Sequence, residues 1–193
     1  MKIEKRLDLL QEKLSSKSFI SMTGLGNEVP YYIFDYPAEK ELLLRESLNR
    51  LIRNLKIQNV KILQLNLFEI ATDLIQAKIP TQKVIDFERK HGSDKLLEKL
   101  RPVLKGSSIT KKIASEVEDS DCDVIFLVGV GTVWPLLRSH SVLNNLQSEL
   151  SNQPVVMFYP GHYTKYDLSL FGKFKDGNYY RAFRLIDYEE ETK

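Results

Sequence analysis

The fold of this chain is decided by two apolar runs, DVIFLVGVG at residues 123–131 and PVVMFYPG at residues 154–161. Neither run alternates cleanly between apolar and polar residues, which is typical of strands buried on both faces of a parallel sheet. Each run ends in glycine or proline, and polar and aromatic residues follow directly. The carboxyl ends of parallel strands meet at one edge of a sheet, where open α/β sheets usually carry their sites. We therefore look for function first within residues 123–186.

The remaining segments alternate between helical and strand patterns. The predicted helices include 1–14, 67–77, 81–104 with a break at Gly92, 107–118 and 135–150, and the other strands are 31–34 and 60–65; residues 15–30 are predicted as a loop. This order predicts one three-layer α/β domain over residues 1–193, with a mostly parallel sheet flanked by helices. The dipeptide Asp176-Gly177 is a strong hairpin signal, which predicts an antiparallel strand at the C-terminal edge. The acidic residues 187–193 are expected to fray.

Composition excludes several classes of protein. The chain has 28 basic and 26 acidic residues, a net charge of +2, which argues against a dedicated nucleic-acid binder but allows a local basic patch. No apolar run reaches the roughly 18–20 residues that span a bilayer, and no signal-peptide core follows the charged N-terminus. A single cysteine excludes an internal disulfide and a cysteine-based zinc site. We expect a cytoplasmic protein without a membrane partner, and the oligomeric state stays open.

The strand exit Gly129-Val130-Gly131 invites a dinucleotide-binding interpretation. The full signature needs a third glycine, and Trp134 stands at that position. A phosphate loop of the form Gly-x-x-x-x-Gly-Lys-Ser/Thr does not occur in the sequence. We interpret the two glycines as a tight strand exit, and we predict no cofactor.

Catalytic groups are equally incomplete. His140 and His162 follow the two apolar runs, but a metal site needs at least three ligands, and neither histidine has a second one at a typical spacing. Ser139 and Ser141 flank His140 without the Gly-x-Ser-x-Gly elbow of a nucleophile. A metal hydrolase built on the two histidines remains a third hypothesis, and we expect the chain not to be an enzyme.

Aromatic residues and arginines in the same stretch favour contact with a partner, because such residues anchor protein interfaces. Arg181 beside Tyr179 is open to three interpretations: part of a core strand, a protein-binding surface, or a platform for single-stranded bases. The predicted partner-binding residues are Trp134, Arg138, His140, Tyr163, Tyr179 and Arg181.

Several motifs together resemble the BrxB family, small components of bacterial BREX (bacteriophage exclusion) gene clusters. They are GVGTVWPLLRSH at 129–140, LNNL at 143–146, FYPG at 158–161, LFG at 170–172, NYYRAFR at 178–184 and FDYP at 34–37. The resemblance implies a role in phage defence beside a large ATPase, a DNA adenine methyltransferase and PglZ, a protein of the alkaline-phosphatase superfamily. It implies no catalytic activity and supplies no catalytic residues.

These observations lead us to expect a non-enzymatic adaptor in a BREX assembly that binds PglZ in the first place and the large ATPase in the second. The alternative is a degenerate nucleotide-fold domain that binds nucleotide or DNA directly, since residues 34–48 have the strand-loop-helix layout of a phosphate-binding unit without its glycine and lysine.

Overall fold

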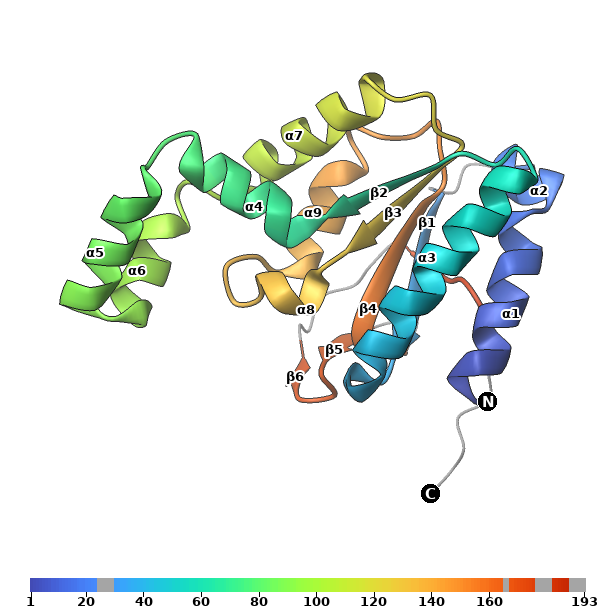
Figure 1. Cartoon of the computed structure of the whole chain (residues 1–193), viewed down its shortest axis with the longest axis horizontal. Helices are drawn as coiled ribbons and strands as arrows, with labels where there is room; N and C mark the ends of the chain where they lie inside the picture. The colour runs from blue at the N-terminus through green and yellow to red at the C-terminus, as the bar shows by residue number, and fades with distance from the viewer. Residues whose placement is uncertain (24–29, 165–166, 176–181, 188–193) are drawn as a thin grey trace.

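A parallel sheet with the strand order β2-β3-β4-β1-β7 forms the centre of the computed structural model, which describes residues 1–23, 30–164, 167–175 and 182–187 (Figure 1). The strands are β1 (Tyr31–Tyr36), β2 (Ile62–Asn66), β3 (Val124–Val128), β4 (Val155–Tyr163), β5 (Leu168–Leu170), β6 (Phe174–Lys175) and β7 (Phe183–Arg184). Neighbours along the central path are all parallel. Strand β5 pairs antiparallel with β4, and β6 with β5. The predicted mostly parallel sheet is confirmed.

Helices cover both faces of this sheet, as Figure 1 shows. They are α1 (Ile3–Leu14), α2 (Lys17–Ile20), η1 (Ala38–Lys40), α3 (Glu41–Ile57), α4 (Leu67–Gln76), α5 (Thr81–His91), α6 (Ser93–Leu100), α7 (Gly106–Glu118), α8 (Val130–Val133) and α9 (Ser139–Leu146). One apolar cluster joins α1, α2 and α3 to Phe34, Phe126 and Phe158 of the sheet. A second cluster joins α4, α7, α8 and α9 to Ile125, Leu127 and Met157 on the opposite face. The sheet is apolar on both faces, so a layer of helices is needed on each side to bury it.

The central strands owe their position to continuous burial. All six residues of β1 are buried, and so are the first four of β3 and the first six of β4. This is why their sequences do not alternate, as expected for strands covered on both faces. Strand β2 lies at the edge, and there the polar Gln64 is exposed.

Helices α5 and α6 form an arm that projects away from the sheet (Figure 1). None of the residues Thr81–His91, all of which the structure describes, is buried, and Leu100 is the buried residue of α6. Gly92 turns the chain between the two helices with a φ of +84°, a conformation that glycine adopts without steric cost. The predicted break at Gly92 is confirmed.

Three local predictions were wrong. Strand β7 pairs parallel with β1 and is not antiparallel, because the chain crosses over and fills the open edge of β1, with Tyr32 opposite Phe183. The helix predicted over 135–150 is shorter, because α9 covers Ser139–Leu146, and the short α8 precedes the predicted range at Val130–Val133. The loop predicted over 15–30 contains α2, whose first turn is capped by the Ser16 hydroxyl.

The hairpin that does form joins β5 to β6 through residues 171–173, earlier than predicted. Phe171 and Gly172 have φ values of +55° and +67°, and the left-handed pair reverses the chain. The predicted turn at Asp176-Gly177 lies outside the described residues, as do 188–193 of the predicted acidic tail. No helix in the described part of the chain has the length and apolar character required to cross a membrane.

Candidate functional site

Two hollows flank the loop that leaves β3 at the carboxyl edge of the sheet. Gly129 lines one of them, and the next residue, Val130, lines the other. Gly129 has a φ of +76°, and a Cβ there would lie 2.2 Å from the Asn66 side-chain oxygen. A Cβ at Gly131 would lie 2.9 Å from the Phe171 ring. Packing within the protein therefore accounts for both glycines, without any need for close approach by a pyrophosphate.

The hollow that Val130 lines is bordered by a surface that we call the aromatic–basic patch. This patch consists of Trp134, Arg138, Phe171, Lys173, Phe174 and Lys175. The Trp134 and Phe174 rings stack with centroids 4.5 Å apart and an interplanar angle of 30°. Phe171 meets both rings edge-on, with each centroid distance at 6.4 Å. Offset-stacked and edge-on pairs are the favourable arrangements of aromatic rings. The three rings therefore support one another, although they come from segments far apart in sequence.

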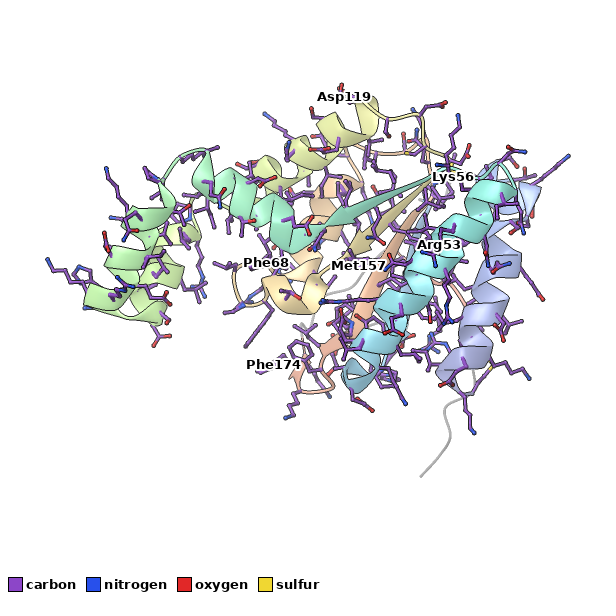
Figure 2. All side chains as sticks on the ribbon, in the orientation of Figure 1. Arg53, Lys56, Phe68, Asp119, Met157 and Phe174 are labelled. Atoms are coloured by element: carbon purple, nitrogen blue, oxygen red, sulfur yellow. The ribbon has the colours of Figure 1, made fainter. Side chains whose placement is uncertain are left out.

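The patch is exposed and its charge has one sign. Trp134 is 36% exposed and Phe174 is 45% exposed, and Figure 2 shows Phe174 projecting from the body of the molecule. A groove of about 340 Å³ runs beside these rings, and the charged residues that line it are Arg138, Lys173 and Lys175. Exposed aromatic rings next to cations form a surface suited to contact with an acidic, partly apolar partner.

The hairpin that carries Phe171 and Phe174 is held in place through its backbone. The Phe171 amide donates to the Pro160 carbonyl at 2.8 Å, and the turn closes through Gly172 N–H to the Ser169 carbonyl at 3.1 Å. A left-handed conformation costs a bulky residue such as phenylalanine about 1–2 kcal/mol. The Phe171 ring lies so close to Gly131 that a Cβ there would meet it, which explains why the loop after β3 has glycine at this position.

A buried ion pair joins α1 to β1, and its carboxylate also accepts a hydrogen bond from the end of β4. The Arg6 guanidinium donates to the Asp35 carbonyl at 2.6 Å and to its carboxylate at 2.9 Å, with side-chain exposures of 4% and 0%. Arg6 also lies over the Phe34 ring, 4.5 Å from its centroid. The second carboxylate oxygen accepts the Tyr163 amide N–H at 3.0 Å. Asp35 thus ties helix α1 to the strand extension from which the β5–β6 hairpin follows.

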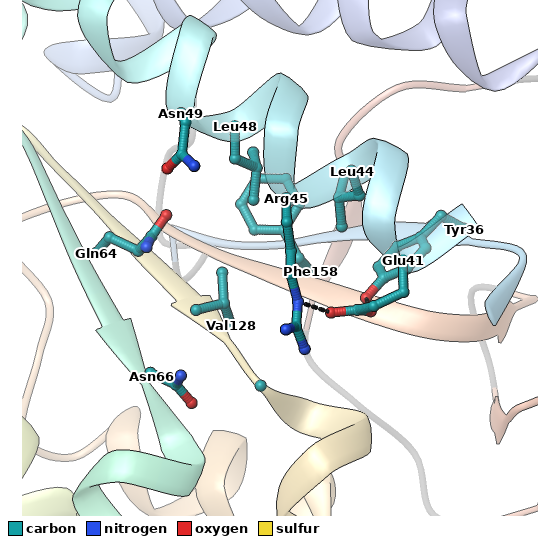
Figure 3. Close-up of a pocket in the computed structure, with 11 residues that line it drawn as sticks. Tyr36, Glu41, Leu44, Arg45, Leu48, Asn49, Gln64, Asn66, Val128 and Phe158 are labelled. Atoms are coloured by element: carbon teal, nitrogen blue, oxygen red, sulfur yellow. Dashed lines mark hydrogen bonds and ion pairs between the residues drawn. The ribbon is translucent and has the colours of Figure 1, made fainter. Parts of the chain in front are cut away.

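The second hollow is a polar crevice of about 170 Å³ between α3 and the ends of β2, β3 and β4 (Figure 3). Its floor is apolar and includes Leu48, Val128 and Phe158. At one end, the Glu41 carboxylate accepts hydrogen bonds from Tyr36 Oη and from Arg45 Nε, the latter at 2.7 Å. Burial raises the pKa of the Tyr36 phenol, and the hydrogen bond to Glu41 raises it further, so this hydroxyl remains a donor.

The residues predicted as partner-binding have four different locations. Trp134 and Arg138 lie together in the aromatic–basic patch. His140 is half-buried on α9 and is not among the residues that line the groove. Tyr163 is fully buried, and its hydroxyl donates to the Ala182 carbonyl at 2.6 Å, so its side chain is not on the surface. Tyr179 and Arg181 lie outside the described residues.

The two histidines considered for metal binding have different surroundings. His162 Nδ1 lies 3.8 Å from the Asp35 carboxylate, whereas His140 belongs to α9. Among the residues that the structure describes, no three His, Cys, Asp or Glu side chains are grouped so that they could hold a metal ion.

Sequence reasoning missed Phe171, Lys173, Phe174 and Lys175 as members of the patch. The sequence pattern of residues 168–174 predicts one continuous strand, whereas in the structure Phe171 and Lys173 lie in the turn between β5 and β6. The signal that could have found them is Phe171-Gly172, since glycine after an aromatic residue favours a turn. The crevice was missed because Arg45 and Gln64 belong to different elements and only the fold brings them to one hollow.

Comparison with known proteins gives the chain a family. A family model described as BREX protein BrxB matches residues 63–185. The chain is 42% identical to a "BREX protein BrxB" of Bacillus cereus (strain H3081.97) over 189 residues, which cover 96% of this chain and 98% of the relative. It is 38% identical to a "BREX protein BrxB" of Escherichia coli O9:H4 (strain HS), covering 95% and 92%. No solved structure matches the chain at a significant level. The chain therefore belongs to the BrxB family, which are components of BREX phage-defence systems.

Proposed function

We propose that this chain is a non-enzymatic adaptor of a BREX assembly and that it binds a companion protein through the aromatic–basic patch. The observation that carries the proposal is the exposed stack of Trp134 on Phe174 beside a groove in which the charged residues that the structure describes are all cations. Interface hot spots are enriched in tryptophan and arginine, and they lie in hollows from which water is excluded when the partner binds.

The physical role of each group follows from its position. The stacked rings offer apolar area that is already ordered, so binding loses little side-chain entropy there. The cations of Arg138, Lys173 and Lys175 attract a surface of opposite charge and orient it during the encounter. We therefore expect the partner to present acidic side chains around an apolar one.

PglZ is the partner that we propose first, and the large ATPase is the second. Both are companions of BrxB proteins in BREX clusters, and a small protein without a catalytic step of its own would act by bringing such proteins together. The same surface could contact only one of them at a time, so competition between the two would reveal which one it serves.

Co-purification of the chain with PglZ from the same gene cluster tests the proposal. Trp134→Ala and Phe174→Ala should each weaken the complex by at least about ten-fold, the loss expected for an interfacial hot spot. Charge reversal at Lys173 should weaken it further and reduce its sensitivity to salt.

Leu42→Ala is the matched control, because Leu42 is an apolar side chain on α3 that is 75% exposed and does not line the groove. This variant should bind like the unchanged protein. An equal loss in the control and in the patch variants would contradict the proposal, as would a chain that purifies alone with every companion present.

A further inference from the structure

The polar crevice between α3 and the ends of β2, β3 and β4 has the features of a small-molecule site that the adaptor role does not use. The residues that line it differ from those that line the groove of the aromatic–basic patch, since Gly129 borders the crevice and Val130 borders the groove. A ligand in the crevice would therefore not need the partner surface, and the two can be tested separately.

The crevice presents hydrogen-bonding groups that the protein itself does not use. The Arg45 Nε donates to Glu41, but its terminal nitrogens have no hydrogen-bond partner within the described part of the chain. The side-chain amides of Asn49 and Gln64 likewise have no hydrogen-bond partner among the described residues. Figure 3 shows these three side chains around one opening, two from α3 and one from β2. Together they offer several donors and two amide acceptors.

The floor of the crevice is apolar and fixed. Leu48 and Phe158 are 3% and 1% exposed, and Val128 lies between them and the opening. An apolar floor below a few convergent polar groups is the usual make-up of a small-molecule pocket. At about 170 Å³ the space suits a single ring system, because pockets for larger ligands begin near 300 Å³.

The charges of the crevice exclude an ionic ligand as its main occupant. Glu41 and Arg45 neutralise each other at 2.7 Å, and Glu41 occupies the first turn of α3, where a phosphate would otherwise bind. A second carboxylate or a phosphate would meet Glu41 at short range. The ligand is therefore uncharged in the part that enters.

We propose that this crevice binds a purine base, presented as a nucleoside, with the ring against Leu48, Val128 and Phe158. Asparagine and glutamine amides pair bidentately with the donor and acceptor edge of adenine, and arginine pairs with the acceptors of guanine. A flat ring with such an edge satisfies the three unused groups at once. In contrast to a site that recognises a nucleotide through its phosphates, this crevice would gain no binding affinity from them.

Titration of the full chain with adenosine, guanosine, cytidine and uridine, followed by NMR of the side-chain amides, tests the proposal. A purine nucleoside should shift the Gln64 and Asn49 side-chain signals in a saturable way, with a Kd on the order of 1 mM for so small a ligand. The two pyrimidine nucleosides should bind at least about three-fold more weakly, because they cover less of the apolar floor.

Two variants and their controls connect binding to the crevice. Gln64→Leu and Arg45→Met keep most of the side-chain volume and should each weaken purine binding by about ten-fold. Arg50→Met is the control for Arg45→Met, because Arg50 lies on the same helix but lines the hollow between α1 and α3. Gln82→Leu on the arm is the control for Gln64→Leu.

Three results would overturn the inference. No saturable shift with any of the four nucleosides would remove the site, and binding that survives both Gln64→Leu and Arg45→Met would place it elsewhere. A nucleoside triphosphate that binds more than about ten-fold tighter than its nucleoside would mean that phosphate, not the base, is recognised. None of these outcomes bears on partner binding at the patch, so the two proposals fail separately.

Discussion

The buried pair of Arg6 and Asp35 should dominate the stability of the N-terminal half of the fold. Arg6→Met leaves the Asp35 carboxylate in a fully buried site without its guanidinium partner, where it still accepts the Tyr163 amide N–H. Asp35→Asn leaves the Arg6 guanidinium buried beside a neutral amide. Removing one partner of a buried ion pair typically costs about 3–5 kcal/mol, so we expect each single variant to lose that much free energy of unfolding.

The double variant should be much less affected than either single one. Methionine fills the space of the arginine stem against the Phe34 ring, and the asparagine oxygen can still accept the Tyr163 N–H. No unpaired charge remains, and buried ion pairs can often be replaced by neutral groups at little cost. We expect Arg6→Met/Asp35→Asn to lie within about 2 kcal/mol of the unchanged protein, with a coupling energy of at least about 2 kcal/mol.

Urea unfolding followed by circular dichroism, and independently by the fluorescence of the single tryptophan, gives the four free energies of this cycle. Coincident transitions would justify a two-state treatment. Additive losses, or single variants that cost less than about 1 kcal/mol, would refute the reasoning, because they would mean that the pair is solvated and not desolvated in the core.

Three further predictions concern single sites. In urea unfolding, Gly129→Ala should destabilise the protein by about 1–3 kcal/mol more than Gly92→Ala. Both glycines have a positive φ, but of these two only Gly129 lacks room for a Cβ. Equal losses in the two variants would contradict the packing argument. Burial raises the pKa of Tyr36 above its usual 10.0, so the unfolded chain loses this proton first. The contribution of Tyr36 to stability should be full below about pH 10 and fall by about 1.4 kcal/mol per pH unit above it. Burial also raises the pKa of Tyr31, so Tyr36→Phe should reduce the total slope without removing it, and tyrosinate absorbance can follow the titration. Leu127→Ala should cost about 2–5 kcal/mol by calorimetry or urea unfolding, whereas the exposed Leu42→Ala should change stability by less than about 0.5 kcal/mol.

The sequence predicted the elements whose residues are buried on all sides. Strand β3 (Val124–Val128) lies within the apolar run from which it was predicted, and it is bounded there by Asp123 and Gly129. The sequence failed where a long-range contact decides the local structure. Strand β7 lies parallel to β1 because that edge of the sheet is open, and no local pattern near Phe183 encodes this.

The candidate site shows the same division. Trp134 and Arg138 could be singled out because they follow a buried strand directly. Their neighbours Phe171 and Phe174 could not be singled out, because their position beside Trp134 depends on a turn with two left-handed residues. Tyr163 had the right residue type, but the sequence does not show that its hydroxyl is used by the Ala182 carbonyl inside the protein.

The projecting arm of α5 and α6 has a consequence for how the molecule opens. Since α5 contributes no buried residue to the core, unfolding this helix exposes little apolar surface and requires much less free energy than unfolding the sheet. Amide hydrogens of Thr81–His91 should exchange with deuterium by local opening, at rates insensitive to low urea, while those of β3 and β4 exchange only on global unfolding. A protease should cut first near Gly92, between the two helices, and leave the sheet folded.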